Sequence, residues 1–150
     1  MEFFRIAAAK HSTQLTSSGT ANRWNKKGEY VLYTGSSRSL STLELVVHRS
    51  SIKPDIIYKV MIISIPDDDT LIKTLKTDDL PNKWRQFEGF PKLQQIGSDW
   101  YQSRASLILK VPSAIIPQEY NYIINTRHQD FQENVKLIRT EHYFWDDRLL

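Results

Sequence analysis

Arginine, tyrosine and glutamate side chains follow one another at similar intervals early in the chain, at Arg23, Tyr33 and Glu44. A guanidinium binds phosphate or carboxylate groups through paired N–H donors, and an aromatic face attracts cations. A carboxylate stabilises positive charge that develops on a substrate. Ser113 follows Pro112 at the end of an apolar run and adds a hydroxyl group. The first three groups converge on one cleft if the loop, strand and helix that carry them fold back on one another.

Each of these residues also has an ordinary structural interpretation. Arg23 can lie on the surface over the ring of Trp24, a cation–π contact worth about 0.5–1 kcal/mol when exposed. Tyr33 shares one face of a predicted strand with Val31, and a core aromatic is the commoner role for such a residue. Ser113 occupies a position typical of turn formers, and no G-x-S-x-G sequence surrounds it, so a serine-hydrolase site is disfavoured.

Glu44 has two interpretations between which local pattern alone does not decide. On a helical wheel it shares a face, or the edge of one, with Leu40 and Val47, where a carboxylate is costly unless a group such as His48 pairs with it. Alternatively, the sequence S-T-L-E matches a capping box in which Ser41 begins the helix and Glu44 bonds back to the backbone. The second interpretation leaves Leu40 outside the helix, although it fits the periodic apolar pattern.

The elements that must position these side chains are predicted from hydrophobic periodicity and turn residues. The small, polar residues 11–22 are predicted to form a loop. A helix is predicted at 39–50, a second around 98–104, and a short one between 66 and 84. Strands are predicted at 29–34, 55–65, 106–115, 119–125 and 134–145. Because these segments do not alternate as regular βαβ units, we expect an α+β fold with a mostly antiparallel or split sheet.

Composition limits the remaining possibilities. A length of 150 residues with 40% hydrophobic and 25% charged residues predicts one soluble globular domain, and the charged N-terminal segment is a poor signal peptide. No apolar run approaches the roughly 20 residues that span a bilayer, so a cytoplasmic protein without membrane contact is expected. The net charge of +3 is small and its basic residues are scattered, which disfavours direct nucleic-acid binding.

Metal and nucleotide motifs are missing from the sequence. There is no cysteine, and the four histidines lack the paired spacing of zinc ligands. Asp67–Asp69 lacks the alternating ligands of a calcium loop and is predicted to be a solvated turn. The five glycines are dispersed, so neither a Rossmann nor a P-loop site is expected. We therefore expect no metal.

Several short motifs, in their order, give the chain a resemblance to a known family. They are R-W-N at 23–25, V-L-Y-T at 31–34, L-E at 43–44 with V-V-H behind it, V-P-S-A-I at 111–115 and N-Y-I-I-N at 121–125. Together they resemble the RES domain family, named for an arginine, a glutamate and a serine, over nearly the whole chain, 1–150. By position, the resemblance implies that Arg23, Glu44 and Ser113 are the three residues for which the family is named. It also implies that Tyr33 is the family's tyrosine.

The resemblance implies a fold similar to that of ADP-ribosyltransferase toxins and the role of toxin in a bacterial type II toxin–antitoxin pair. It implies NAD as a substrate rather than a cofactor, cleaved between nicotinamide and ribose by hydrolysis or phosphorolysis. Protein ADP-ribosylation is the first alternative, and a non-enzymatic or RNA-directed toxin the second. The implied partner is an Xre-like antitoxin, with a homodimer possible in the complex. His48, Asn121 and Asn125 are further candidates for binding the ligand, beside Arg23 and Tyr33 and with Ser113.

Four residues, at three places in the chain, depart from the family pattern. Ala21 and Asn22 stand where glycines usually precede the arginine, Thr126 where a proline usually follows the asparagine at 125, and Asp147 where proline is common near the end. The named residues are intact. We expect these departures to bear on the loop before Arg23 and on substrate preference.

Overall fold

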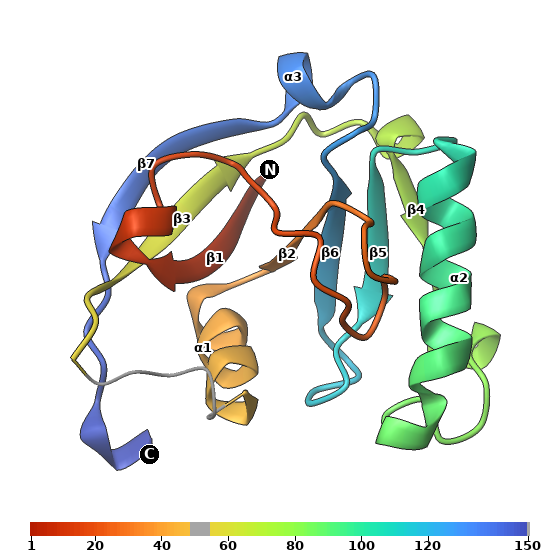
Figure 1. Ribbon diagram of the computed structural model, residues 1–150, viewed down its shortest axis with the longest axis horizontal. Coiled ribbons are helices and arrows are strands. Elements are labelled where there is room, and N and C mark those ends of the chain that lie inside the picture. Colours follow the sequence, from red (N-terminus) through yellow and green to blue (C-terminus); the bar gives the residue numbers. More distant parts are fainter. Residues whose placement is uncertain (49–54, 150) are drawn as a thin grey trace.

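A computed structural model describes residues 1–48 and 55–149 and contains a seven-stranded sheet in the order β4-β5-β6-β2-β1-β3-β7 (Figure 1). The strands are β1 (Glu2–Ala8), β2 (Val31–Gly35), β3 (Tyr58–Ser64), β4 (Ile72–Thr74), β5 (Ile108–Pro112), β6 (Tyr120–Asn125) and β7 (Lys136–His142). The α-helices are α1 (Arg38–Val47), α2 (Phe90–Ser103) and the short α3 (Phe131–Asn134).

The sheet is divided near its middle. Strands β1 and β2 are paired at only one register position, Phe4 with Gly35, whereas β1 pairs with β3 along its whole length. Among the described pairings only β4 with β5 is parallel. The predicted α+β class with a split, mostly antiparallel sheet is therefore confirmed.

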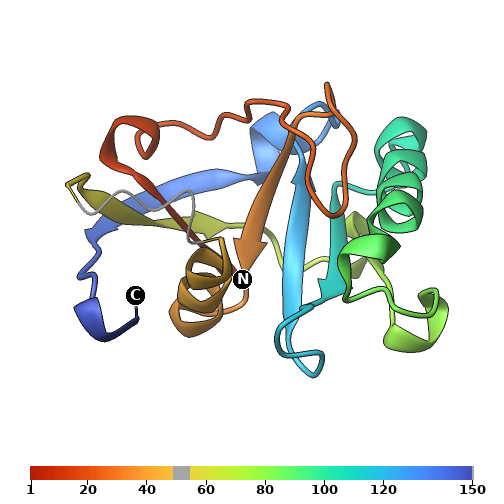
Figure 2. The ribbon, with the colours of Figure 1, turned by 60° about the horizontal axis from the view of Figure 1, so that its bottom comes forward.

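Two apolar cores lie on opposite faces of the central strands, as the alternation of side chains along a strand requires. On β2, Leu32 belongs to the first core and Val31 to the second; on β6, Ile124 and Ile123 divide in the same way. The second core is closed by α2, which runs beside the β4–β5 edge (Figure 1). Figure 2 shows β2, β6 and β5 between α1 and α2. Side chains of α1 can therefore reach β2 and β6 from the side opposite α2.

Helix α1 begins one turn earlier than the capping-box interpretation requires. Its N-cap is Ser37, whose hydroxyl accepts the N–H of Leu40 at 3.0 Å. Ser41 lies inside the helix and donates to the carbonyl oxygen of Phe4 at 3.0 Å. The predicted capping role of Ser41 and Glu44 is therefore wrong, because the periodic Leu40 is buried within the helix. The Glu44 side chain is left available for other contacts.

Two glycines allow elements of the site to approach closely. A side chain at Gly35 would place its Cβ 2.6 Å from the Ser41 hydroxyl, so α1 could not lie as near to β2. A Cβ at Gly97 of α2 would lie 1.7 Å from the carbonyl oxygen of Trp24. The loop that carries Arg23 therefore rests directly on α2.

The other predicted elements are mostly confirmed, with shorter ends. The predicted loop at 11–22 and strands near 29–34, 55–65, 106–115, 119–125 and 134–145 are present. Helix α2 starts at Phe90, well before the predicted segment, and β1 and β4 were not predicted. The last two residues of the helix predicted at 39–50 lie outside the described residues. In place of a short helix, the region from 66 to 84 contains two 3-10 turns around β4.

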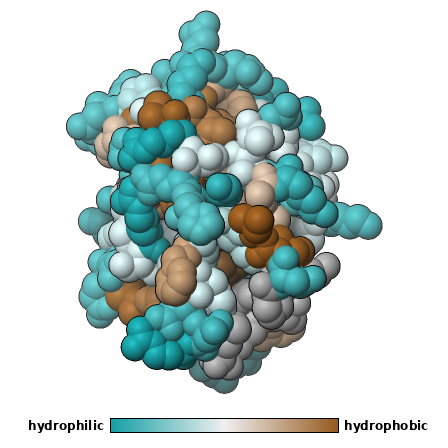
Figure 3. All heavy atoms as spheres, turned by 90° about the vertical axis from the view of Figure 1, so that its left-hand side faces the viewer, coloured by the Kyte–Doolittle hydropathy of each residue, from teal (hydrophilic) through white to brown (hydrophobic). Residues whose placement is uncertain are grey.

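No helix within the described ranges has the length and apolar character needed to cross a bilayer. Figure 3 views the side that lies to the left in Figure 1, and that face is largely polar with small, separate apolar patches.

We expect Gly97→Ala to lower the free energy of unfolding by about 1–3 kcal/mol, because the added methyl group overlaps the Trp24 backbone. In an unobstructed helix the same change stabilises by about 0.8–1 kcal/mol, since alanine has the higher helix propensity. Urea unfolding followed by circular dichroism measures the sign. A more stable Gly97→Ala variant would show that the loop does not rest on α2.

Candidate functional site

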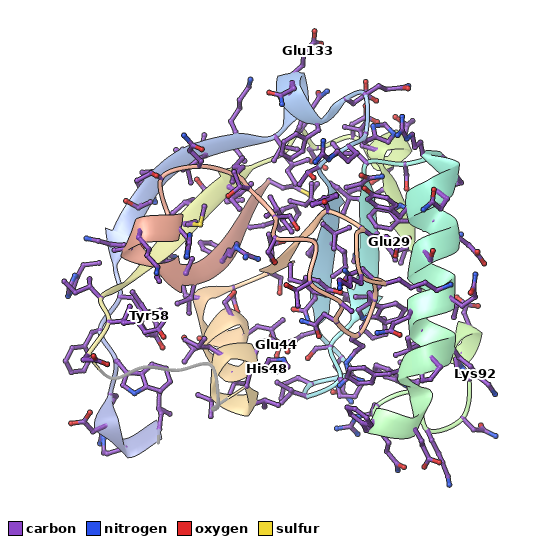
Figure 4. The ribbon with its side chains drawn as sticks, viewed as in Figure 1. Glu29, Glu44, His48, Tyr58, Lys92 and Glu133 are labelled. Carbon is purple, nitrogen blue, oxygen red and sulfur yellow. The ribbon has the colours of Figure 1, made fainter. Side chains whose placement is uncertain are left out.

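Five of the predicted residues line one cavity of about 420 Å³, namely Arg23, Tyr33, Glu44, His48 and Asn121. Helix α1 supplies Glu44 and its C-cap His48, and Figure 4 shows both side chains on that helix. Strand β2 supplies Tyr33, β6 supplies Asn121, and the loop before β2 supplies Arg23. The predicted convergence of loop, strand and helix on one cleft is therefore present in the geometry.

One oxygen of Glu44 is held by two donors from the neighbouring strands β5 and β6, at the end of β5 and the start of β6. Its Oε1 accepts a hydrogen bond from Asn121 Nδ2 at 2.7 Å and another from Ser113 Oγ at 3.1 Å. Glu44 Oε2 has no hydrogen-bond partner within residues 1–48 and 55–149. The carboxylate is thus oriented by one oxygen and presents the other to the cavity.

Ser113 acts on the cavity through Glu44. It is fully buried at 0% exposure and is not among the residues that line the cavity. Its Oγ accepts the N–H groups of Ile115 at 3.1 Å and Ile116 at 3.2 Å, so its hydroxyl proton is directed at Glu44. The turn-forming role weighed from the sequence is present together with a contact to Glu44, and direct contact with a ligand in the cavity does not fit this burial.

Asn121 has a buried carbonyl oxygen without a partner. Its Nδ2 donates to Glu44, and its Oδ1 makes no hydrogen bond with any described residue. An unsatisfied buried acceptor costs about 1–3 kcal/mol. Reversing the amide would place Oδ1 against the carboxylate, which is less favourable. The orientation of Asn121 is therefore determined by Glu44.

The Arg23 guanidinium lies over the ring of Phe90, with 4.5 Å between Cζ and the ring centroid. The predicted contact with the Trp24 ring is wrong, because Trp24 is buried in the second core. Arg23 Nη1 donates to the carbonyl oxygens of Trp84 at 3.1 Å and Arg85 at 3.3 Å. Partial burial lowers the pKa of Arg23 from its ordinary value, and the charge of Glu44 opposes this shift.

Tyr33 combines its two predicted roles. Its ring packs against the second core and also lines the cavity. Its hydroxyl accepts the N–H of Trp24 at 3.0 Å and donates to Asn25 Oδ1 at 2.5 Å. Burial raises the pKa of this hydroxyl above its ordinary value, so it stays protonated near neutral pH. Tyr33 therefore fixes the loop of Arg23 with its hydroxyl and offers only its ring to a ligand.

Asn125 does not reach the cavity, which corrects the binding role predicted for it. It is fully buried, its Nδ2 donates to the carbonyl oxygen of Tyr101 at 3.3 Å, and its Oδ1 accepts the N–H of Arg127 at 2.9 Å. The first bond connects the end of β6 to α2, and the second holds the turn that follows β6. Its place two residues beyond Ile123 on the same strand face puts it under α2 rather than under α1.

Arg5 of β1 lines the cavity and was not singled out from the sequence. Its Nη1 donates to the carbonyl oxygen of Tyr33 at 3.2 Å, and burial lowers the pKa of its guanidinium. It makes no ion pair with any carboxylate in the part of the chain that the structure describes. The signal in the sequence is a cation within the otherwise apolar segment F-F-R-I.

Two of the residues that depart from the family pattern, Asn22 and Thr126, make hydrogen bonds next to the site. Thr126 donates its N–H at 3.1 Å and its hydroxyl at 2.6 Å to the carbonyl oxygen of Tyr30, and a proline can make neither bond. Asn22 Oδ1 accepts the N–H of Arg23 at 2.8 Å, and its carbonyl oxygen accepts Gln94 Nε2 at 2.9 Å. These contacts hold the start of the Arg23 loop without a glycine. Asp147 begins a 3-10 turn at the C-terminal end.

Comparisons with known proteins identify the family and the fold. The model of the RES domain matches residues 2–146. The chain is 34% identical to "Toxin Res" of Yersinia enterocolitica over 127 residues, covering 85% of this chain and 82% of that protein. It is 32% identical to "Prs ADP-ribosylating toxin" of a Sphingobium species over 155 residues, covering 99% and 96%. The fold is similar to a chain in the crystal structure of the M. tuberculosis MbcT–MbcA toxin–antitoxin complex, with a TM-score of 0.77, 16% identity and coverage of 95% and 83%.

We expect Ser113 and Glu44 to be energetically coupled. Ser113→Ala should lower the free energy of unfolding by about 1–3 kcal/mol, because it removes a buried hydroxyl with three partners. The loss should be smaller in a Glu44→Ala background, and a double-mutant cycle in urea measures the difference. Ser98→Ala is the matched control, since this buried hydroxyl bonds Glu29 instead. Equal losses in both backgrounds would contradict the coupling.

Proposed function

Because this chain belongs to the RES domain family, we propose that it is the toxin of a toxin–antitoxin pair and that it depletes NAD by cleaving the nicotinamide–ribose bond. The observation that carries the proposal is the free oxygen of Glu44, held in a cavity that two arginines and an aromatic ring also line. Such a set matches a ligand with a pyrophosphate, a sugar and a cationic ring. The names of the relatives as toxins support the biological role.

Cleavage of NAD at this bond passes through a ribose with oxocarbenium character. Nicotinamide leaves as a neutral molecule from a cationic ring, so the reaction does not require a general acid. It does require negative charge near the sugar. In this proposal Glu44 Oε2 accepts from a ribose hydroxyl and favours the developing cation, or orients the attacking water. Asn121 and Ser113 keep the carboxylate in place, so that it need not reorganise during the reaction.

The two arginines suit the pyrophosphate. Each guanidinium offers several donors in a fixed plane, which matches phosphate oxygens. Arg23 has its Nε and Nη2 groups unbonded among the described residues, while Nη1 is engaged with the carbonyl oxygens of Trp84 and Arg85. Arg5 lies on β1, and among the described residues its hydrogen-bond partner is the carbonyl oxygen of Tyr33 alone. A bound dianion would compensate both partly buried charges.

Tyr33 suits the nicotinamide ring. An aromatic face attracts a cationic ring more strongly than the neutral product, which assists departure. The hydroxyl is occupied by Trp24 and Asn25, so its contribution is stacking rather than proton transfer. His48, at the exposed end of α1, lies where it could contact the ribose or the acceptor.

Transfer of ADP-ribose to a protein is the second candidate, and the name of the Sphingobium relative favours it. Labelled NAD separates the two activities, because transfer leaves the label on a macromolecule whereas cleavage releases ADP-ribose or its phosphate. We further propose an Xre-like antitoxin as partner and the cytoplasm as the place of action. NAD is a substrate rather than a cofactor in this scheme.

We expect Glu44→Gln to lower kcat for nicotinamide release by about 100-fold or more while leaving the fold intact, because it removes the charge and keeps the shape. The purified toxin, free of antitoxin, is assayed with NAD for free nicotinamide. Glu133→Gln is the control, since Glu133 lies on α3 at the far end of the molecule (Figure 4). Wild-type turnover by Glu44→Gln would refute the proposed role of this carboxylate.

We expect Arg5→Met to have opposite effects on stability and on catalysis. Removing a buried cation that has no ion-pair partner should raise the free energy of unfolding, by about 1 kcal/mol. Losing a charged hydrogen bond to the pyrophosphate should lower kcat/KM for NAD by about 10–150-fold, mainly through KM. Urea unfolding and steady-state kinetics on the same preparation measure both. An unchanged KM would remove Arg5 from the dinucleotide site.

A further inference from the structure

A second cavity, an open surface depression of about 410 Å³ in which Lys83, Arg85 and Gln86 are exposed, lies beside the first and has no role in the chemistry described so far. It is lined by Lys83, Trp84, Arg85, Gln86 and Ala114, and Ala114 also lines the first cavity. We propose that the second cavity binds the adenosine half of the dinucleotide. This inference rests on the proposed function, and it assigns the part of the substrate that does not react.

The two cavities are joined through Arg23. Its guanidinium lines the first cavity and donates to the carbonyl oxygens of Trp84 and Arg85, which belong to the second. From the other side, Arg85 Nε donates to the carbonyl oxygen of Ala114 at 2.7 Å. A pyrophosphate bound at Arg23 would therefore lie next to the second cavity, with Trp84 within reach of an attached nucleoside.

The lining segment is fixed before any ligand binds. We call residues 83–89 the rim loop. Lys83 adopts a left-handed backbone with φ of 61°, and its ammonium pairs with Glu88 at 3.3 Å. A Cβ at Gly89 would lie 2.6 Å from the Lys83 carbonyl oxygen and 2.9 Å from Trp84 Cα, so the loop closes tightly on itself. Because Arg23 and Arg85 are both bonded to main-chain carbonyl oxygens, the second cavity needs little ordering to accept a ligand.

The side chains of the rim loop have the chemistry of a purine site. Trp84 packs partly against the second core and also lines the second cavity, which makes it a supported platform for stacking. Gln86 offers a donor and an acceptor for the edge of a base, and Lys83 and Arg85 add positive charge for phosphate or ribose oxygens. An aromatic platform beside an amide favours a base over an acidic peptide.

Nicotinamide release from NAD and from nicotinamide mononucleotide tests the assignment, because the mononucleotide lacks the adenosine half. We expect Trp84→Ala to raise KM for NAD about tenfold through loss of stacking, and to leave KM for the mononucleotide unchanged. Trp84→Phe should retain most of the affinity for NAD. Trp145→Ala is the control, because Trp145 lines neither cavity and packs against Tyr143.

Two kinetic results would overturn the adenosine assignment. Equal increases in KM for both substrates would show that Trp84 acts by holding Arg23, and no change for either would leave the second cavity without a role in binding. If the wild-type protein releases nicotinamide from neither substrate, the proposed function fails by itself. Calorimetry with adenosine monophosphate then decides the second cavity alone: binding that Trp84→Ala abolishes supports it, and no binding to the wild type ends it.

Discussion

The site depends on one carboxylate oxygen, Glu44 Oε1, that joins helix α1 to the end of β5 and the start of β6. A half-buried carboxylate is unfavourable unless donors replace the water it loses. Ser113 and Asn121 are those donors, and the lone pairs of Ser113 are in turn occupied by the N–H groups of the following turn. The helix of Glu44, the end of β5 and the start of β6 are thereby held in one arrangement, with the second oxygen presented to the cavity.

The opposite wall of the cavity is also held in place by a small number of hydrogen bonds and close contacts. The hydroxyl of Tyr33 bonds to Trp24 and Asn25, and Gly97 lets that loop rest on α2. The Arg23 side chain then bridges to the rim loop. Neither Arg23 nor Arg5 has an ion pair among the described residues. Two partly buried cations without carboxylates lower the stability of the empty protein, and an anionic ligand offsets that cost.

The fold tolerates much sequence change around this arrangement. The MbcT–MbcA structure shares it at 16% identity. Alternating apolar residues suffice to divide β2 and β6 between two cores, and many sequences satisfy that pattern. The departures at Asn22 and Thr126 illustrate the same tolerance, because each replaces a family residue and supplies bonds of its own. In this chain the two residues thus provide main-chain hydrogen bonds next to the site while the fold is kept.

The sequence by itself determined the α+β class, most strands and the helix of Glu44, because period-2 and period-3.6 patterns report which face is buried. The order of its short motifs also indicated Arg23, Tyr33, Glu44 and Ser113. Only the tertiary structure decided what these side chains touch. Glu44 does not cap its helix, because the helix begins at Ser37 rather than at Ser41. The aromatic ring that Arg23 contacts is that of Phe90. Asn125 bonds to α2 and Arg5 lines the cavity for the same reason. Tertiary packing determines contacts between residues far apart in the chain, and no local sequence pattern predicts them.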